Sequence, residues 1–147
     1  GAVIAPGGSG EVEAQLALRQ GGRTGEAQAL LETSARIVAR ARREGPLPSW
    51  FELNAARIEA VRGNRAAALA ALLRARDLGA TRQWSDADLG VVRWPDQDPL
   101  LAPLASDPQV AAWFRQMAAD RARELRETEA LLGSAKVAWL LARPLAA

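Results

Sequence analysis

Apolar residues recur every three or four positions along most of this chain, and that spacing places them on one face of an α-helix. One such stripe consists of Ala27, Leu30, Leu31, Ser34, Ile37, Val38 and Ala41. Glycine and proline residues interrupt the stripes and mark the ends of the helices. We therefore expect helices over residues 11–20, 24–44, 49–63, 65–78 and 108–132.

Residues with capping side chains stand at the expected helix starts. Ser49, followed by Glu52 three positions later, has the pattern of a capping box. Thr24, Asn64 and Asp107 each precede a helical stripe and suit the N-cap position. The last and longest helix should bury a face made of Val110, Phe114, Met117, Leu125 and Leu132, with Trp113 alongside.

The segments between and beyond these helices differ from them in composition. Residues 1–10 contain a Gly-Gly-Ser-Gly string and read as a flexible arm or linker, either engineered or a natural hinge. Residues 80–106 contain prolines, aspartates and Trp84 and Trp94, and we expect an irregular connector pinned to the helices by its tryptophans. The expected helical domain spans residues 11–133, and residues 134–147 form an apolar tail.

Composition supports one all-α domain. The chain has 147 residues, and alanine, leucine, arginine and glutamate, which are good helix formers, dominate it. β-branched residues are sparse, and no run of alternating apolar and polar residues has the length of a strand. No apolar run approaches the roughly 20 residues of a membrane span, so we expect no membrane insertion.

The chemistry open to this chain is narrow. It has no cysteine and no histidine, and no tyrosine, so disulfides, metal sites built on those side chains and histidine-dependent catalysis are excluded. Its 19 basic and 17 acidic residues leave a net charge of only +2, which is not the signature of a nucleic-acid binder. We expect no enzyme activity, metal or cofactor. The lack of cysteine fits a cytoplasm and a periplasm equally.

Two segments of the chain repeat the same spacing. Each begins with a turn glycine, Gly22 or Gly63, and has a small residue five positions later, a large apolar residue nine positions later and a small residue twelve positions later. The small residues allow two helices to approach closely, and the large ones fill the space between neighbouring pairs. These positions are Ala27, Leu31 and Ser34 in the first copy and Ala68, Leu72 and Ala75 in the second.

This repeat resembles the tetratricopeptide repeat (TPR). The resemblance implies antiparallel helical hairpins stacked into an α-solenoid, here with the irregular connector and the long C-terminal helix. The Asp-Pro-rich stretch from Asp96 to Pro108 resembles the closing segment of TPR arrays in bacterial multidomain signalling proteins. The implied function is protein or peptide binding, through a concave helical groove or an end face, within a larger protein.

In TPR domains the first helix of each hairpin lines the groove. Carried over by position, the resemblance implies peptide contacts at Leu16, Gln20, Trp50, Leu53, Asn54 and Arg57. Asn54 offers both a donor and an acceptor, and Arg57 offers a fork for a carboxylate.

The apolar tail has two interpretations, because Val137, Trp139, Leu140 and Leu141 form a sticky patch if they are left in water. Residues 134–147 either form a helix that caps the array or act as an internal peptide ligand or the contact of a homodimer. If the apolar tail makes a self-contact, the chain is a structural or oligomerisation module. A less favoured alternative is an enzyme that uses the carboxylates of residues 84–107, namely Asp86, Asp88, Asp96 and Asp98.

Overall fold

The computed structural model describes residues 21–81 and 94–142. Within these ranges the chain forms α-helices and two short 3-10 helices and contains no strand, which confirms the all-α prediction. The elements are α2 (Thr24–Glu44), α3 (Ser49–Arg62), α4 (Arg65–Asp77), η1 (Pro95–Gln97), η2 (Ala102–Ser106), α5 (Pro108–Leu132) and α6 (Ala135–Ala142). The predicted arm or linker, the helix over residues 11–20 and the contacts at Leu16 and Gln20 lie outside the described residues.

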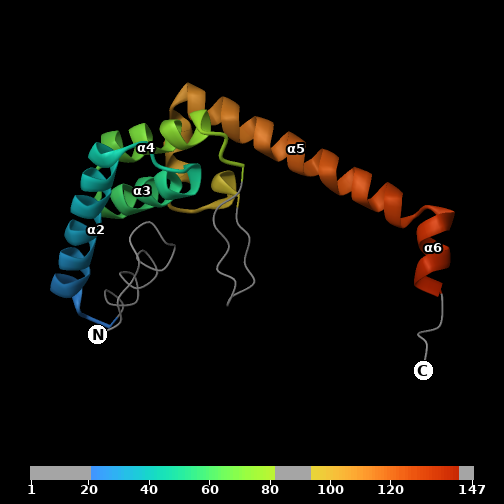
Figure 1. Ribbon diagram of the computed structural model, residues 1–147, viewed down its shortest axis with the longest axis horizontal. Helices are drawn as coiled ribbons and strands as arrows, with labels where there is room; N and C mark the ends of the chain where they lie inside the picture. The colour runs from blue at the N-terminus through green and yellow to red at the C-terminus, as the bar shows by residue number, and fades with distance from the viewer. Residues whose placement is uncertain (1–20, 82–93, 143–147) are drawn as a thin grey trace.

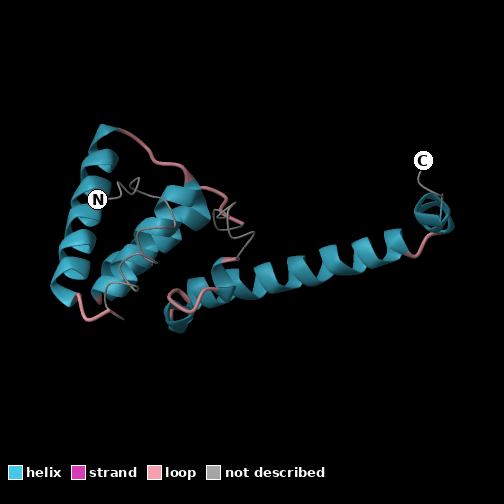
Figure 2. Cartoon of the chain, turned by 90° about the horizontal axis from the view of Figure 1, so that it is seen from below, coloured by secondary structure: helices cyan, strands magenta, loops and turns pink. Residues whose placement is uncertain are grey.

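The helices gather at one end of the molecule, and α5 runs away from them (Figure 1). α3 and α4 form a closely packed hairpin, and α2 lies against α3. η1 and η2 carry the chain from this body to the start of α5. α6 sits at the far end of α5, well separated from α2, α3 and α4, as a second view also shows (Figure 2).

Local signals explain most of the helix ends. Asn64 accepts a hydrogen bond from the Ala67 amide at 3.2 Å, and Asp107 accepts one from the Gln109 amide at 2.9 Å, as predicted for N-caps. Gly63 has a φ of +79°, a left-handed conformation that glycine adopts without a Cβ penalty. Two predicted caps are wrong. α2 starts at Thr24 itself, after Arg23, and α3 starts at Ser49 itself, with Glu52 engaged elsewhere.

The two repeated segments bury the same positions. All six of their spaced small and large residues are at most 4% exposed. Gly22 and Gly63, which open the two copies, have φ values of +78° and +79°. The spacing read from the sequence therefore identifies equivalent positions at the starts of α2 and α4. The six buried residues are Ala27, Leu31, Ser34, Ala68, Leu72 and Ala75.

The connector is clipped to the hairpin by a buried ion pair. Nε of Arg57, on α3, lies 2.7 Å from Oδ2 of Asp98, and the two side chains are only 4% and 1% exposed. The other carboxylate oxygen of Asp98 accepts a hydrogen bond from the Leu100 amide at 2.9 Å. This arrangement fixes the turn that places Leu101 and Leu104 in the core.

α5 has a buried half and an exposed half. Val110, Phe114 and Met117 pack into the core, as predicted. Leu125 and Leu132 were expected on the same buried face, but they are 59% and 54% exposed. That part of the prediction is wrong, because α5 extends past the body and nothing among the described residues covers its second half.

Candidate functional site

The structure buries three of the four predicted groove residues of α3. Leu53, Asn54 and Arg57 are 1%, 4% and 3% exposed, whereas Trp50 is 37% exposed. Nδ2 of Asn54 donates to the backbone oxygen of Trp50 at 3.1 Å, and Arg57 holds Asp98. Leu53, Asn54 and Arg57 therefore do not line an open groove in this structure. The Asn54 hydrogen bond lies within α3, and the Arg57 ion pair joins α3 to the connector.

A different group of charged side chains meets where α2, α3 and α4 come together. Glu52 is 3% exposed and receives a two-pronged contact from Arg42, whose Nε donates at 3.0 Å and whose Nη2 donates at 2.6 Å. Nε of Arg74, on α4, lies 3.4 Å from the same carboxylate. Burial alone would raise the pKa of Glu52. The hydrogen bonds and charge of Arg42, with the charge of Arg74, outweigh burial and hold it below its ordinary value.

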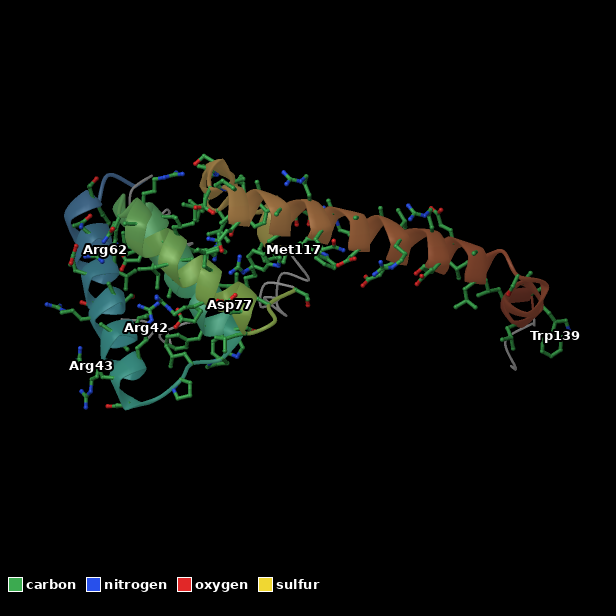
Figure 3. All side chains as sticks on the ribbon, turned by 90° about the horizontal axis from the view of Figure 1, so that it is seen from above. Arg42, Arg43, Arg62, Asp77, Met117 and Trp139 are labelled. Carbon is green, nitrogen blue, oxygen red and sulfur yellow. The ribbon has the colours of Figure 1, made fainter. Side chains whose placement is uncertain are left out.

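These three residues line a cleft of about 410 Å³. Its walls come from the end of α2, the α2–α3 turn, the start of α3 and the end of α4, and the other lining residues are Gly45, Pro46, Leu47, Asp77 and Leu78. Arg42 points from α2 toward the hairpin, whereas its neighbour Arg43 points into solvent (Figure 3). Sequence reasoning missed this site. It placed Glu52 in a capping box, and no sequence signal pairs Glu52 with Arg42.

A second surface is the projecting segment, which we define as residues 122–142. It carries six large apolar side chains with exposed fractions between 51% and 74%, and these are Leu125, Leu131, Leu132, Trp139, Leu140 and Leu141. Among the described residues of the tail, α6 lies at the far end of α5 and does not cover α2, α3 or α4 (Figures 1 and 2). The side chain of Val137 lies outside the described residues.

The projecting segment leaves the body in a defined direction. At its base Arg121 donates to both carboxylate oxygens of Asp96, each at 2.8 Å. The same guanidinium lies 5.3 Å from the ring centre of Trp94, within the range of a cation–π contact. The ion pair raises the pKa of Arg121 above its ordinary value, chiefly through the hydrogen bond to Asp96. α5 is thus held to the connector at the point where its exposed half begins.

The carboxylates considered for catalysis are divided by the structure. Asp86 and Asp88 lie outside the described residues. Asp96 is in contact with Arg121 and Asp98 with Arg57, so both serve to fix the connector. Among the described residues, no three acidic side chains come close enough together to hold a metal ion.

Comparison of the chain with protein-family models, curated proteins and solved structures found no match. In the described ranges, none of the helices combines the length and the apolar character needed to cross a membrane.

Proposed function

We propose that this chain is a protein-binding helical module whose contact surface is the projecting segment. The observation that carries the proposal is the set of six exposed apolar side chains on α5 and α6, with α5 held to the connector by the ion pair between Arg121 and Asp96. Large apolar side chains that are exposed together and held out from the body are typical of an interaction site.

The face exposed on the projecting segment continues the face buried nearer the body. Val110, Phe114 and Met117 are followed at helical spacing by Leu125 and Leu132 on the same side of α5. A partner packed against the second half of α5 would extend the existing core along the helix. Such helix-on-helix packing is a recurrent way for proteins to recognise an amphipathic segment.

The energetics fit a contact of moderate strength. Covering side chains that are about half exposed is worth about 1–2 kcal/mol each, or about 6–12 kcal/mol for six of them. Association costs an amount of similar size before any net affinity appears. The partner buries apolar side chains of its own in the same contact, and because they add a similar gain, we expect a Kd in the micromolar range.

The TPR resemblance supports the same class of function. We propose that the body is the closing part of a TPR-like array in a larger bacterial protein, in which stacked helices present a preformed surface. The equivalent burial of the two repeated segments favours this origin. In this proposal the binding surface is the end of the array and its projecting helix, not the concave groove.

A test selects peptides from a displayed library on the full chain and counter-selects them on a Leu125→Asp/Leu132→Asp double variant. We expect peptides that bind the full chain and lose binding to the double variant. Ile37→Asp, at a 39% exposed isoleucine on the body, is the matched control and should bind normally. Peptides that bind all three proteins equally, or no selected peptide at all, would contradict the proposal.

Self-association is a second candidate function for the same surface. It is favoured by the presence of exposed apolar side chains on both α5 and α6, which on α6 are Trp139, Leu140 and Leu141. Sedimentation of the full chain over a wide concentration range distinguishes the candidates. A dimer that Leu132→Asp dissociates supports self-association, whereas a monomer at all concentrations excludes it.

A further inference from the structure

We propose that the cleft between α2, α3 and α4 binds a carboxylate attached to a small apolar group, such as an acidic residue or chain end beside an aliphatic side chain. This site lies on the body and is independent of the function proposed for the projecting segment. Its ligand class follows from three properties of the lining residues: their charge, their available donors and their apolar walls.

The first property is a surplus of positive charge. Glu52 is one carboxylate shared by two guanidiniums, those of Arg42 and Arg74. Asp77, the other acid of the cleft, has its own partner in Arg76 at 2.9 Å. The three arginines and two carboxylates leave a net charge of +1, which one added carboxylate would neutralise. A doubly charged phosphate would instead leave the cleft with a net charge of −1, next to the carboxylates of Glu52 and Asp77.

The second property is a set of donors held in place. Within the described residues, the guanidinium of Arg74 contacts no acid other than Glu52, and it does so through Nε, so its two terminal nitrogens still have donors to offer. Arg74 is 44% exposed, so a ligand can reach these donors. The buried Glu52 contacts both Arg42 and Arg74 and restricts their side chains, which reduces the entropy lost when they bind a ligand. A planar guanidinium matches the two oxygens of a carboxylate.

The third property is the apolar wall beside the arginines. Pro46 and Leu47 of the α2–α3 turn line the cleft together with Leu78, which is 49% exposed. A cleft of about 410 Å³ has room for a side chain or two of a peptide and not for a folded element. The same ligand therefore has to carry its carboxylate close to an aliphatic group.

The test uses NMR on the full chain labelled with ¹⁵N, observing the Nε–H signals of Arg42 and Arg74. Four probes are titrated: N-acetyl-Leu-Leu with a free carboxylate, the same peptide as its amide, N-acetyl-Leu-Glu-amide and inorganic phosphate. We expect either or both carboxylate probes to shift these signals with a Kd in the millimolar range. Which carboxylate probe binds more tightly distinguishes a chain end from an acidic side chain.

Variants locate the binding. Arg74→Gln should raise the Kd of the carboxylate probe about tenfold or more, because hydrogen bonds to charged groups are stronger than those between neutral groups. Leu47→Ala should raise this Kd several-fold while leaving every charge in place. Arg43→Gln removes the same charge from the outer side of α2 and should change the Kd less than twofold (Figure 3). Circular dichroism confirms that each variant is folded.

Four results would overturn the proposal. They are an amide probe that binds as tightly as the free carboxylate, phosphate that binds more tightly than either carboxylate, an Arg43→Gln variant as impaired as Arg74→Gln, and no shift of either arginine signal at high probe concentration. None of these results depends on whether the projecting segment binds a protein.

Discussion

The buried pair between Arg57 and Asp98 allows a direct test of what holds the connector to the hairpin. Replacing Asp98 with Asn removes the negative charge but keeps an oxygen to accept the Leu100 amide. Arg57 is then a buried cation, 4% exposed, that has lost its carboxylate at 2.7 Å. Breaking a buried pair in this way costs about 3–5 kcal/mol.

That loss is large against the total of about 5–15 kcal/mol that stabilises a domain of this size. It corresponds to a fall in Tm of about 6–20 °C. Urea unfolding followed by circular dichroism gives the free energy of unfolding of the parent chain and of the variant. The double variant Arg57→Met/Asp98→Asn removes both charges, so we expect it to be less destabilised than the two single changes added together.

A loss below about 1 kcal/mol for Asp98→Asn would refute this reasoning, because that is the value of an exposed ion pair. Additive single changes would refute it as well, since they would show that Arg57 and Asp98 are not coupled. Asp107→Ala is a useful comparison, because it removes an N-cap on α5 without a buried charge and should cost about 0.5–2 kcal/mol.

Three further predictions concern other parts of the structure. Because folding lowers the pKa of Glu52, ionised Glu52 contributes its full stabilisation above pH 4.5, the ordinary pKa, and this stabilisation is lost as pH falls through the lower pKa of the folded chain. Acid unfolding of the parent chain and of Glu52→Gln should therefore differ below pH 4.5. Phe114→Ala should cost about 3–5 kcal/mol in urea unfolding, whereas Leu132→Ala, further along α5, should cost less than about 1 kcal/mol. Gly63→Ala should cost about 1 kcal/mol, because φ is +79° there and no atom lies within 4 Å of the added Cβ, so the cost is backbone strain and not a clash.

The helices were predictable because their causes are local. Asn64 and Asp107 cap the turns next to them, and the extents of α2 and α5 follow the apolar stripes and the breaking residues. The sites were less predictable. Asn54 and Arg57 were expected to face a ligand by analogy with a groove, but each found a partner within the chain. A polar side chain looks the same in a sequence whether it meets a ligand or a distant segment.

The sequence by itself determined the all-helical class, the helix ends and the six repeated positions that are buried between helices, because periodicity and capping act over a few residues. Only the tertiary structure decided that Glu52 meets Arg42 and Arg74 and that the body ends near Arg121. Both outcomes depend on which distant segments come into contact. Past Arg121 the same face of α5 still carries Leu125 and Leu132, now with Glu124 and Thr128 between them, and helical spacing alone does not say where the packing against this face stops.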